Sequence, residues 1–196
     1  MKVLIIIPAY NEEESIEKVI NNLKQNYSQY DYVIINDGSH DHTSEICHKN
    51  KYKIIDLPVN LGLTGAFQTG LKYAYKKGYD YAIQFDADGQ HLPEYIPAMV
   101  DKIEEGYDMV IGSRFVEKPK PRSLRMLGSR VISTAIKITT GVHIADPTSG
   151  MRLFNKTLIR EFAENINYEP EPDTVSFLIK QGVKVAEVQV EMKERE

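Results

Sequence analysis

A short acidic segment, residues 85–91 (FDADGQH), has the residue types and spacing of a divalent-cation site. Asp86, Asp88 and Gln90 alternate along it, so two carboxylates and one amide oxygen can share one cation. Mg²⁺ and Mn²⁺ prefer such oxygen ligands and keep substrate phosphates in their coordination shell. The alternatives are a solvated Asp-Gly turn and, less well matched, an EF-hand loop, whose glycine at position six and glutamate at position twelve are absent. His91 could also join the metal, although a single histidine in a turn is more often not a ligand.

A second polar cluster follows the first apolar run and has the composition of a nucleotide pocket. It contains Pro8, Tyr10, Asn11 and Glu12. The amide and carboxylate groups can hydrogen-bond a base, and the tyrosine ring can pack on it. Taken alone, the segment fits helix capping better, because Asn11 and Glu14 have the spacing of a capping box.

A third cluster, NDGS at residues 36–39, places Asp37 where a carboxylate could accept a hydrogen bond from a base or a ribose hydroxyl. Taken alone, it fits a turn better. Gly38 would then supply a positive φ, and Ser39 or Asp41 would cap the next helix.

Residues 60–70 are rich in glycine but do not form a phosphate loop. Gly65 and Gly70 have the required spacing, yet Leu71 and Lys72 stand where lysine and serine or threonine are needed. We therefore expect the glycines to permit close approach of the backbone to a ligand or to another element, with Gly65 as a substrate-binding candidate.

The elements that must position these clusters alternate between strand and helix. Short apolar runs predict strands at 2–8, 31–35, 52–57, 79–85 and 107–111. Helical spacing predicts helices around 16–23, up to 46, over 63–74 and from about 94. This order predicts an α/β fold of Rossmann-like type, a mostly parallel sheet flanked by helices. Ligands of such sheets bind beyond the carboxyl ends of the strands, so the three polar clusters should converge on one crevice.

The pattern changes after Gly112. Residues 114–130 are strongly basic, with Arg114, Lys118, Lys120, Arg122, Arg125 and Arg130. Such a run is usually a solvated face, but the interleaved prolines and leucines also fit a membrane surface or an anionic acceptor. We expect a helix from near 123, a second near 172–181 and a final strand at 183–190.

The segment DPTSGMRLF at residues 146–154 is expected to be a loop that enters a strand. Ser149 and Arg152 could contact a phosphate of an acceptor or a donor. The alternative is a tight turn at Gly150, with Arg152 on the edge of the sheet.

Composition sets the broad class of the protein. The 196 residues are 42% hydrophobic and 27% charged, which suits one globular domain. The net charge of −4 gives no reason to expect a nucleic-acid partner, and the single cysteine fits a reducing compartment. With no signal peptide and no apolar run of about 20 residues, we expect a cytoplasmic protein, in peripheral contact with the inner face of the cell membrane or with a membrane partner.

The order of the motifs carries more information than any one of them. IPAYNEE, NDGS, NxGxxGA, DADGQ, GSR and DPTSGMRLF follow one another along nearly the whole chain. In this the chain resembles the family 2 glycosyltransferases of GT-A fold, and most of all the dolichyl- or polyprenyl-phosphate mannosyl- and glucosyltransferases. The resemblance implies one catalytic domain over 1–196, with a nucleotide-sugar half at 1–112 and an acceptor half at 113–196.

The resemblance also implies roles for individual residues. The nucleoside would be bound by Pro8, Tyr10, Asn11, Glu12 and Asp37. Mg²⁺ or Mn²⁺ and the donor diphosphate would be held by Asp86, Asp88 and Gln90. The remaining contacts, to the acceptor phosphate or the donor diphosphate, would come from Arg114, Arg125, Arg130, Ser149 and Arg152. Asp88, Arg114 and Arg125 are the predicted catalytic residues.

The implied reaction is transfer of a sugar, with inversion, from a nucleoside-diphosphate sugar to a polyprenyl phosphate or another lipid-linked acceptor of the cell envelope. A sugar hydroxyl is the alternative acceptor, and it would need a carboxylate base. The candidates are Glu169, Glu171 and Asp173, which equally fit acids at a helix start.

Two further functions would be a sugar-nucleotide-binding subunit without turnover and a nucleotidyltransferase. The second fits poorly, because no glycine-rich basic loop follows the first strand.

Two features depart from the family pattern. Asn36 stands where many members have an aspartate, so only Asp37 carries over. Many members continue into an amphipathic or transmembrane region, whereas this chain ends at Glu196 in a charged run, which is compatible with a longer natural protein.

Overall fold

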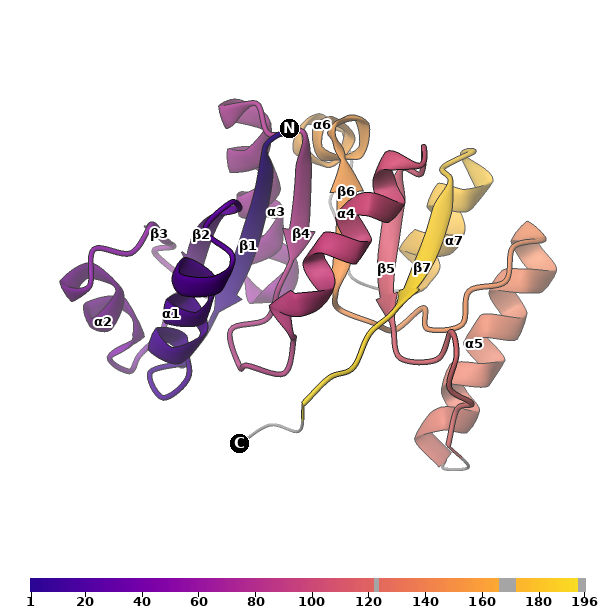
Figure 1. Cartoon of the computed structure of the whole chain (residues 1–196), viewed down its shortest axis with the longest axis horizontal. Helices are drawn as coiled ribbons and strands as arrows, with labels where there is room; N and C mark the ends of the chain where they lie inside the picture. The colour runs from indigo at the N-terminus through magenta and orange to yellow at the C-terminus, as the bar shows by residue number, and fades with distance from the viewer. Residues whose placement is uncertain (122–123, 166–171, 194–196) are drawn as a thin grey trace.

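The centre of the molecule is a seven-stranded sheet with the order β3-β2-β1-β4-β6-β5-β7 (Figure 1). The computed structural model describes residues 1–121, 124–165 and 172–193. The strands are β1 (Val3–Ala9), β2 (Asp31–Asn36), β3 (Ile54–Asp56), β4 (Tyr81–Gln84), β5 (Met109–Ser113), β6 (Arg152–Asn155) and β7 (Val185–Gln189). All neighbouring strands are parallel except β6, which pairs antiparallel with both β4 and β5. The predicted mostly parallel α/β fold is confirmed.

Helices cover both faces of this sheet (Figure 1). They are α1 (Ile16–Asn26), α2 (Thr43–Lys49), α3 (Gly62–Lys77), α4 (Ile96–Glu104), α5 (Leu124–Thr140), α6 (Lys156–Glu164) and α7 (Pro172–Lys180), with a 3-10 turn at Pro93–Tyr95. One core cluster contains side chains of α1, α2 and α4, and the other contains side chains of α3, α5, α6 and α7. None of the helices in the described ranges is long and apolar enough to cross a bilayer.

The first strand shows how the apolar run dictates this layering. Ile5 and Ile7 belong to the core cluster under α1 and α4, whereas Leu4 and Ile6 belong to the cluster under α3. Because successive strand residues point to opposite faces, a strand covered on both sides must be apolar throughout. Each fully buried side chain of this kind stabilises the fold by about 1.5–3 kcal/mol.

Gly70 shows why α3 needs a glycine in its middle. A Cβ at this position would lie 2.2 Å from Cγ2 of Ile6 on β1. Any larger residue would push α3 away from the sheet. The predicted close approach of the backbone to another element is therefore confirmed at Gly70.

Two elements differ from the sequence expectation. Helix α6 was not predicted, although Leu158, Ile159 and Phe162 have helical spacing and are buried. The Asn155 side chain caps this helix by accepting a hydrogen bond from the Leu158 N–H at 3.0 Å. Strand β6 lies between β4 and β5, so the alternative that placed Arg152 on the edge of the sheet is wrong.

Candidate active site

The turn after β1 binds directly to the loop after β2. Asn11 has a left-handed backbone, with φ at 55°, and its N–H donates to Ser39 Oγ at 3.0 Å. Its side-chain oxygen accepts a hydrogen bond from the His40 N–H at 2.9 Å. The expectation that Asn11 caps the first helix is therefore wrong, because its side chain joins two loops; the residue at the N-cap of α1 is Ser15. Asparagine suits this position since it tolerates the left-handed region.

Neighbouring residues strengthen the same junction. The Glu12 N–H donates to Thr43 Oγ1 at 2.8 Å, and the Glu12 carboxylate accepts from Ser15 Oγ at 2.8 Å. The Tyr10 ring is 43% exposed and meets the His40 ring edge-on, with the centroids 6.3 Å apart. Pro8 is half-buried at the end of β1. The two polar clusters thus form one rigid surface at the carboxyl edge of the sheet.

Asp37 is buried and supports the next loop. Its Oδ1 accepts a hydrogen bond from the Leu61 N–H at 2.7 Å, and its own N–H donates to the Ala9 carbonyl at 2.8 Å. Gly38 has φ at 68°, and a Cβ there would lie 2.9 Å from the Asn60 nitrogen. The turn predicted for this segment is present, and Asp37 fixes the approach to α3. Gly65 follows in the first part of α3, where a Cβ would lie 2.4 Å from Cβ of Leu61.

The segment after β4 forms a tight turn at the same edge. Asp88 Oδ1 accepts a hydrogen bond from the Gln90 N–H at 3.0 Å, and Gly89 supplies a φ of 77°. The side chain of Asp86 is 34% exposed. In the part of the chain that the structure describes, no three His, Cys, Asp or Glu side chains cluster to hold a metal by themselves. Two carboxylates of this turn with an amide oxygen still form the hard donor set that Mg²⁺ and Mn²⁺ accept.

His91 lies under this turn rather than on its surface. Its side chain is 2% exposed, and Nδ1 accepts a hydrogen bond from the Asp86 N–H at 2.9 Å. Burial lowers the pKa of His91, although the neighbouring carboxylates of Asp86 and Asp88 oppose the shift. The ring is therefore neutral near pH 7.

A cleft of about 890 Å³ lies between the start of α1 and the turn after β4. Asn11 and Glu12 contribute to one wall, and Asp88 and His91 contribute to the other. Lys193 also lines the cleft, and its N–H donates to the Gln90 carbonyl at 3.0 Å. The fold therefore brings residues from two of the three predicted clusters, those at 8–12 and 85–91, to the walls of one cleft.

Arg114 is held rigidly at the end of β5. Its Nε and Nη2 donate to the two carboxylate oxygens of Asp146 at 2.7 and 2.9 Å, and its N–H donates to the same carboxylate at 3.2 Å. This pairing raises the pKa of Arg114 despite partial burial. Asp146 is fully buried, whereas the Arg114 side chain is 26% exposed. The bidentate pair fixes the orientation of the guanidinium.

The loop that carries Asp146 is itself braced. The Glu187 carboxylate on β7 accepts hydrogen bonds from the N–H groups of Ala145 and Asp146 at 2.6 and 2.8 Å. The Ser149 hydroxyl donates to the Gly112 carbonyl. Arg152 is 1% exposed and donates to the carbonyls of Ser149 and Pro147 at 3.0 and 2.9 Å. Ser149 and Arg152 thus hold this loop together and do not reach the surface.

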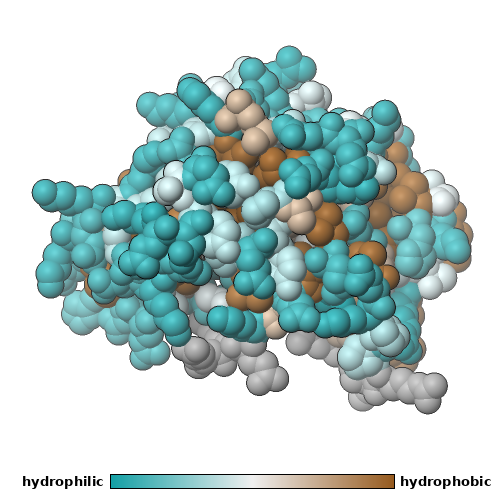
Figure 2. Space-filling view, in the orientation of Figure 1, coloured by the Kyte–Doolittle hydropathy of each residue, from teal (hydrophilic) through white to brown (hydrophobic). Residues whose placement is uncertain are grey.

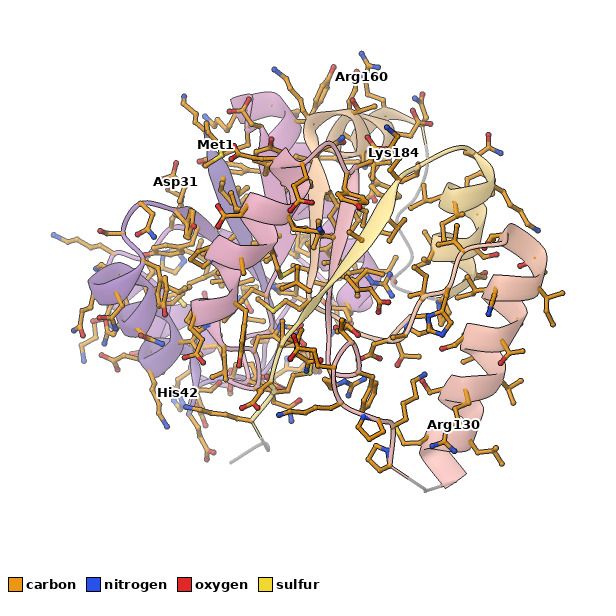
Figure 3. All side chains as sticks on the ribbon, turned by 45° about the vertical axis from the view of Figure 1, so that its right-hand side comes forward. Met1, Asp31, His42, Arg130, Arg160 and Lys184 are labelled. Carbon is orange, nitrogen blue, oxygen red and sulfur yellow. The ribbon has the colours of Figure 1, made fainter. Side chains whose placement is uncertain are left out.

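The remaining predicted residues lie within residues 113–196. Figure 3 shows Arg130 at the end of the molecule opposite Arg160 and Lys184, and its Nη2 donates to the Lys120 carbonyl at 2.7 Å. Asp173 stands in the first turn of α7, where its Oδ1 accepts from the Thr174 N–H at 3.0 Å, as expected for an acid at a helix start. Three predictions lie outside the described residues or side chains: Arg125, Glu169 and Glu171.

A model of the glycosyl transferase family 2 matches residues 4–162 of this chain. The chain belongs to this family. It is 33% identical to the UDP-N-acetylglucosamine–dolichyl-phosphate N-acetylglucosaminyltransferase of Methanococcus voltae, over 96% of this chain and 84% of that protein. It is 30% identical to the undecaprenyl-phosphate mannosyltransferase of Micrococcus luteus, over 100% of this chain and 85% of that protein.

Solved structures show the same fold. Glucosyl-3-phosphoglycerate synthase from Mycobacterium tuberculosis, in complex with Mn²⁺, uridine diphosphate and phosphoglyceric acid, superposes with a TM-score of 0.75. The sequence identity is 20%, over 100% of this chain and 71% of that chain. The predicted GT-A fold and the resemblance to the polyprenyl-phosphate sugar transferases are confirmed. This family 2 chain is a glycosyltransferase of the hexosyltransferase type.

Proposed function

We propose that this glycosyltransferase moves a sugar, with inversion, from a nucleoside-diphosphate sugar to a polyprenyl phosphate or a related lipid-linked acceptor of the cell envelope. The cleft between Asn11 and Asp88 carries the donor part of this proposal, because it joins a base-binding surface to a carboxylate turn. The relatives named for transfer to dolichyl or undecaprenyl phosphate support the acceptor part.

The turn after β4 would hold Mg²⁺ or Mn²⁺ through Asp86, Asp88 and Gln90. A cation bound there would offset the negative charge that builds on the leaving diphosphate. Lys193 adds a positive side chain to the same cleft. Tyr10, Asn11 and Glu12 would bind the nucleoside at the opposite wall.

Arg114 suits the positioning of a phosphate. A lipid phosphate is already anionic, so its oxygen needs orientation rather than a strong base. The bidentate contact with Asp146 fixes the guanidinium and leaves part of it exposed.

Helix α5 offers a surface for a lipid acceptor. Leu127, Val131 and Ile138 are 55%, 63% and 79% exposed and share one side of the helix. Its inner side carries Ser129 and Ser133, which accept hydrogen bonds from the Lys120 ammonium at 2.8 and 2.9 Å. Figure 2 shows hydrophobic surface at the right-hand edge, where Figure 1 places α5. The apolar side of the helix is therefore turned outward.

The charge around this helix matches an anionic membrane. Residues 118–145 contain no aspartate or glutamate but carry six lysines and arginines, whereas the whole chain has a net charge of −4. Each basic residue near an anionic lipid surface contributes about 1 kcal/mol, and each apolar side chain that is fully buried in it contributes about 1.5–3 kcal/mol. We propose peripheral contact with a membrane through α5.

The donor proposal is tested by a thermal-shift panel of uridine, guanosine and thymidine diphosphate sugars, with and without Mn²⁺. A true donor raises the melting temperature by mass action, and more so with the metal. The purified chain should then glycosylate a water-soluble polyprenyl phosphate in detergent. Full activity in excess chelator would contradict the proposed requirement for a metal. Transfer only to free sugar hydroxyls would contradict a lipid phosphate as the acceptor.

The membrane proposal is tested by sedimentation with vesicles. The chain should bind vesicles that contain phosphatidylglycerol more than neutral ones, and less as salt rises. Replacing Leu127, Val131 and Ile138 by glutamine should abolish binding. Val59→Gln is the matched control, because Val59 is 58% exposed but lies outside α5. Equal loss in the control, or no loss in the triple variant, would contradict a role of α5.

A further inference from the structure

Both nitrogens of the His91 ring face the same residue. Nδ1 accepts the hydrogen bond from the Asp86 N–H at 2.9 Å, and Nε2 lies 3.4 Å from Asp86 Oδ2. A neutral ring that accepts at Nδ1 carries its proton on Nε2, so the side facing the carboxylate is the positive one. The 3.4 Å separation is longer than a strong hydrogen bond, and the contact is mainly electrostatic and steric.

The His91 side chain is only 2% exposed and packs against two neighbours. It meets the Phe85 ring edge-on, with the centroids 5.5 Å apart. A Cβ built on Gly150 would lie 3.6 Å from Cε1 of His91 and 3.5 Å from Oδ2 of Asp86, so the loop from the acceptor half closes the other side. The backbone of His91 pairs with Met192 in an antiparallel bridge. His91 is therefore packed between the Phe85–Asp86 segment and the loop of Gly150, and its backbone is joined to Met192.

We infer that His91 is a positioning residue, which fixes the Asp86 carboxylate in the orientation that binds the divalent cation. This inference rests on the proposed metal site. Groups behind a ligand orient it and raise its affinity, and their loss typically reduces metal affinity 10- to 100-fold. The ring suits this task because one nitrogen holds the Asp86 backbone while the other faces its side chain.

Two amide variants separate these contacts. In His91→Asn, the amide oxygen can take the place of Nδ1 and accept from the Asp86 N–H, but nothing remains near the carboxylate. In His91→Gln, the amide nitrogen can take the place of Nε2, but the backbone bond is lost. Both variants lose the contact with Phe85, so each is a control for the general effect of removing the ring.

The readout is Mn²⁺ affinity, measured by electron paramagnetic resonance with the metal alone and with uridine diphosphate. His91→Asn should bind Mn²⁺ about 10- to 100-fold more weakly, whereas His91→Gln should retain most of the affinity but melt at a lower temperature. Ile103→Ala removes a buried side chain of α4 away from the turn and should lower the melting temperature without changing Mn²⁺ affinity.

Three results would decide against parts of this scheme. Unchanged Mn²⁺ affinity in His91→Asn would overturn the positioning role and leave His91 as a packing residue. A nitrogen directly bound to Mn²⁺ in electron spin echo spectra of the wild type, lost in His91→Asn, would make His91 a ligand and also overturn it. If the wild type itself bound no Mn²⁺, even with uridine diphosphate, the metal site of the proposed function would fail instead.

Discussion

Two loops of this molecule have similar polar compositions and opposite surroundings. The turn after β4 leaves Asp86 one-third exposed and lines the cleft with Asp88. The loop before β6 buries Asp146 completely and Arg152 almost completely. The loops meet where Gly150 lies against Asp86. Their side chains nevertheless have different partners, because Asp88 lines the cleft, whereas Asp146 and Arg152 bind other groups of the protein.

The difference teaches that a polar motif can serve the framework rather than the substrate. Arg152 uses its guanidinium to hold the carbonyls of Ser149 and Pro147. A buried guanidinium needs hydrogen-bond acceptors close to it, and the backbone carbonyls supply them. We propose that the residues that act on phosphate are those whose side chains stay partly exposed, above all Arg114.

The strongest test of this contrast is Arg152→Met. The variant leaves two buried carbonyls without their donor, so it should lower the free energy of unfolding by about 3–5 kcal/mol. Urea unfolding followed by circular dichroism measures the loss. Arg152→Lys should recover only part of it, because an ammonium group lacks the forked geometry. Loss of turnover with unchanged stability would instead show that Arg152 meets the substrate.

Asp88→Ala should show the opposite behaviour. If Asp88 binds the proposed cation beside the leaving diphosphate, its removal should reduce kcat/KM by about 10²–10³-fold, equivalent to about 3–4 kcal/mol. Stability should change little, because Asp88 lies in a turn that lines the cleft and its carboxylate accepts a local hydrogen bond from the Gln90 N–H. Kinetics and urea unfolding on the same sample provide the check. A variant that retains activity at low Mn²⁺ would contradict the assignment of Asp88.

Asp146→Asn tests the contact between the loop before β6 and the Arg114 guanidinium. An amide cannot match the fork of Arg114 with two acceptor oxygens, so the guanidinium should lose its fixed orientation. We expect kcat/KM to fall about tenfold, or about 1.4 kcal/mol, with the acceptor KM rising more than the donor KM. Equal changes in both KM values would indicate general loosening of the loop. Glu187→Gln, one step further from Arg114, should have a smaller effect.

The smallest expected effect concerns the exposed pair of His42 and Glu13, which stabilises the turn after β1. A hydrogen bond to Glu13 raises the pKa of His42, and hydrogen bonds from His42 lower the pKa of Glu13. The raised pKa of His42 gives stability that is complete below its unfolded value of 6.5 and lost as the pH rises through the folded value. The lowered pKa of Glu13 gives stability that is complete above 4.5 and lost at lower pH.

Thermal melts of His42→Ala should therefore differ from wild type mainly between pH 4.5 and 6.5 and converge at alkaline pH. His42→Gln is the control, because it offers a hydrogen bond without a titratable charge. A difference that persists unchanged at alkaline pH would show that packing, and not the charge of His42, accounts for the effect.

Much of the fold and the location of the site followed from local patterns. Apolar runs predicted the parallel strands, because a strand buried on both faces is apolar throughout. Helical spacing of apolar residues predicted most helices. The missed helix α6 has an asparagine cap and only three buried apolar residues, a signal too short to separate it from the strand before it. For Asn11, the spacing offered helix capping as the alternative to nucleoside binding, whereas its hydrogen-bond partner, His40, is 29 residues away.

The sequence by itself determined the family, the alternation of strands and helices and the edge of the sheet at which the polar clusters meet. These features depend on the order of the motifs and on the periodic burial of side chains, and both can be recognised from residues that are close together in the sequence. Only the tertiary structure decided which polar side chains face the cleft and which hold the loops. Arg152 and Arg114 are both arginines in motifs, and what separates them is burial: Arg152 is 1% exposed, whereas the Arg114 side chain is 26% exposed. That burial depends on long-range packing of the loop before β6, so no local pattern could report it.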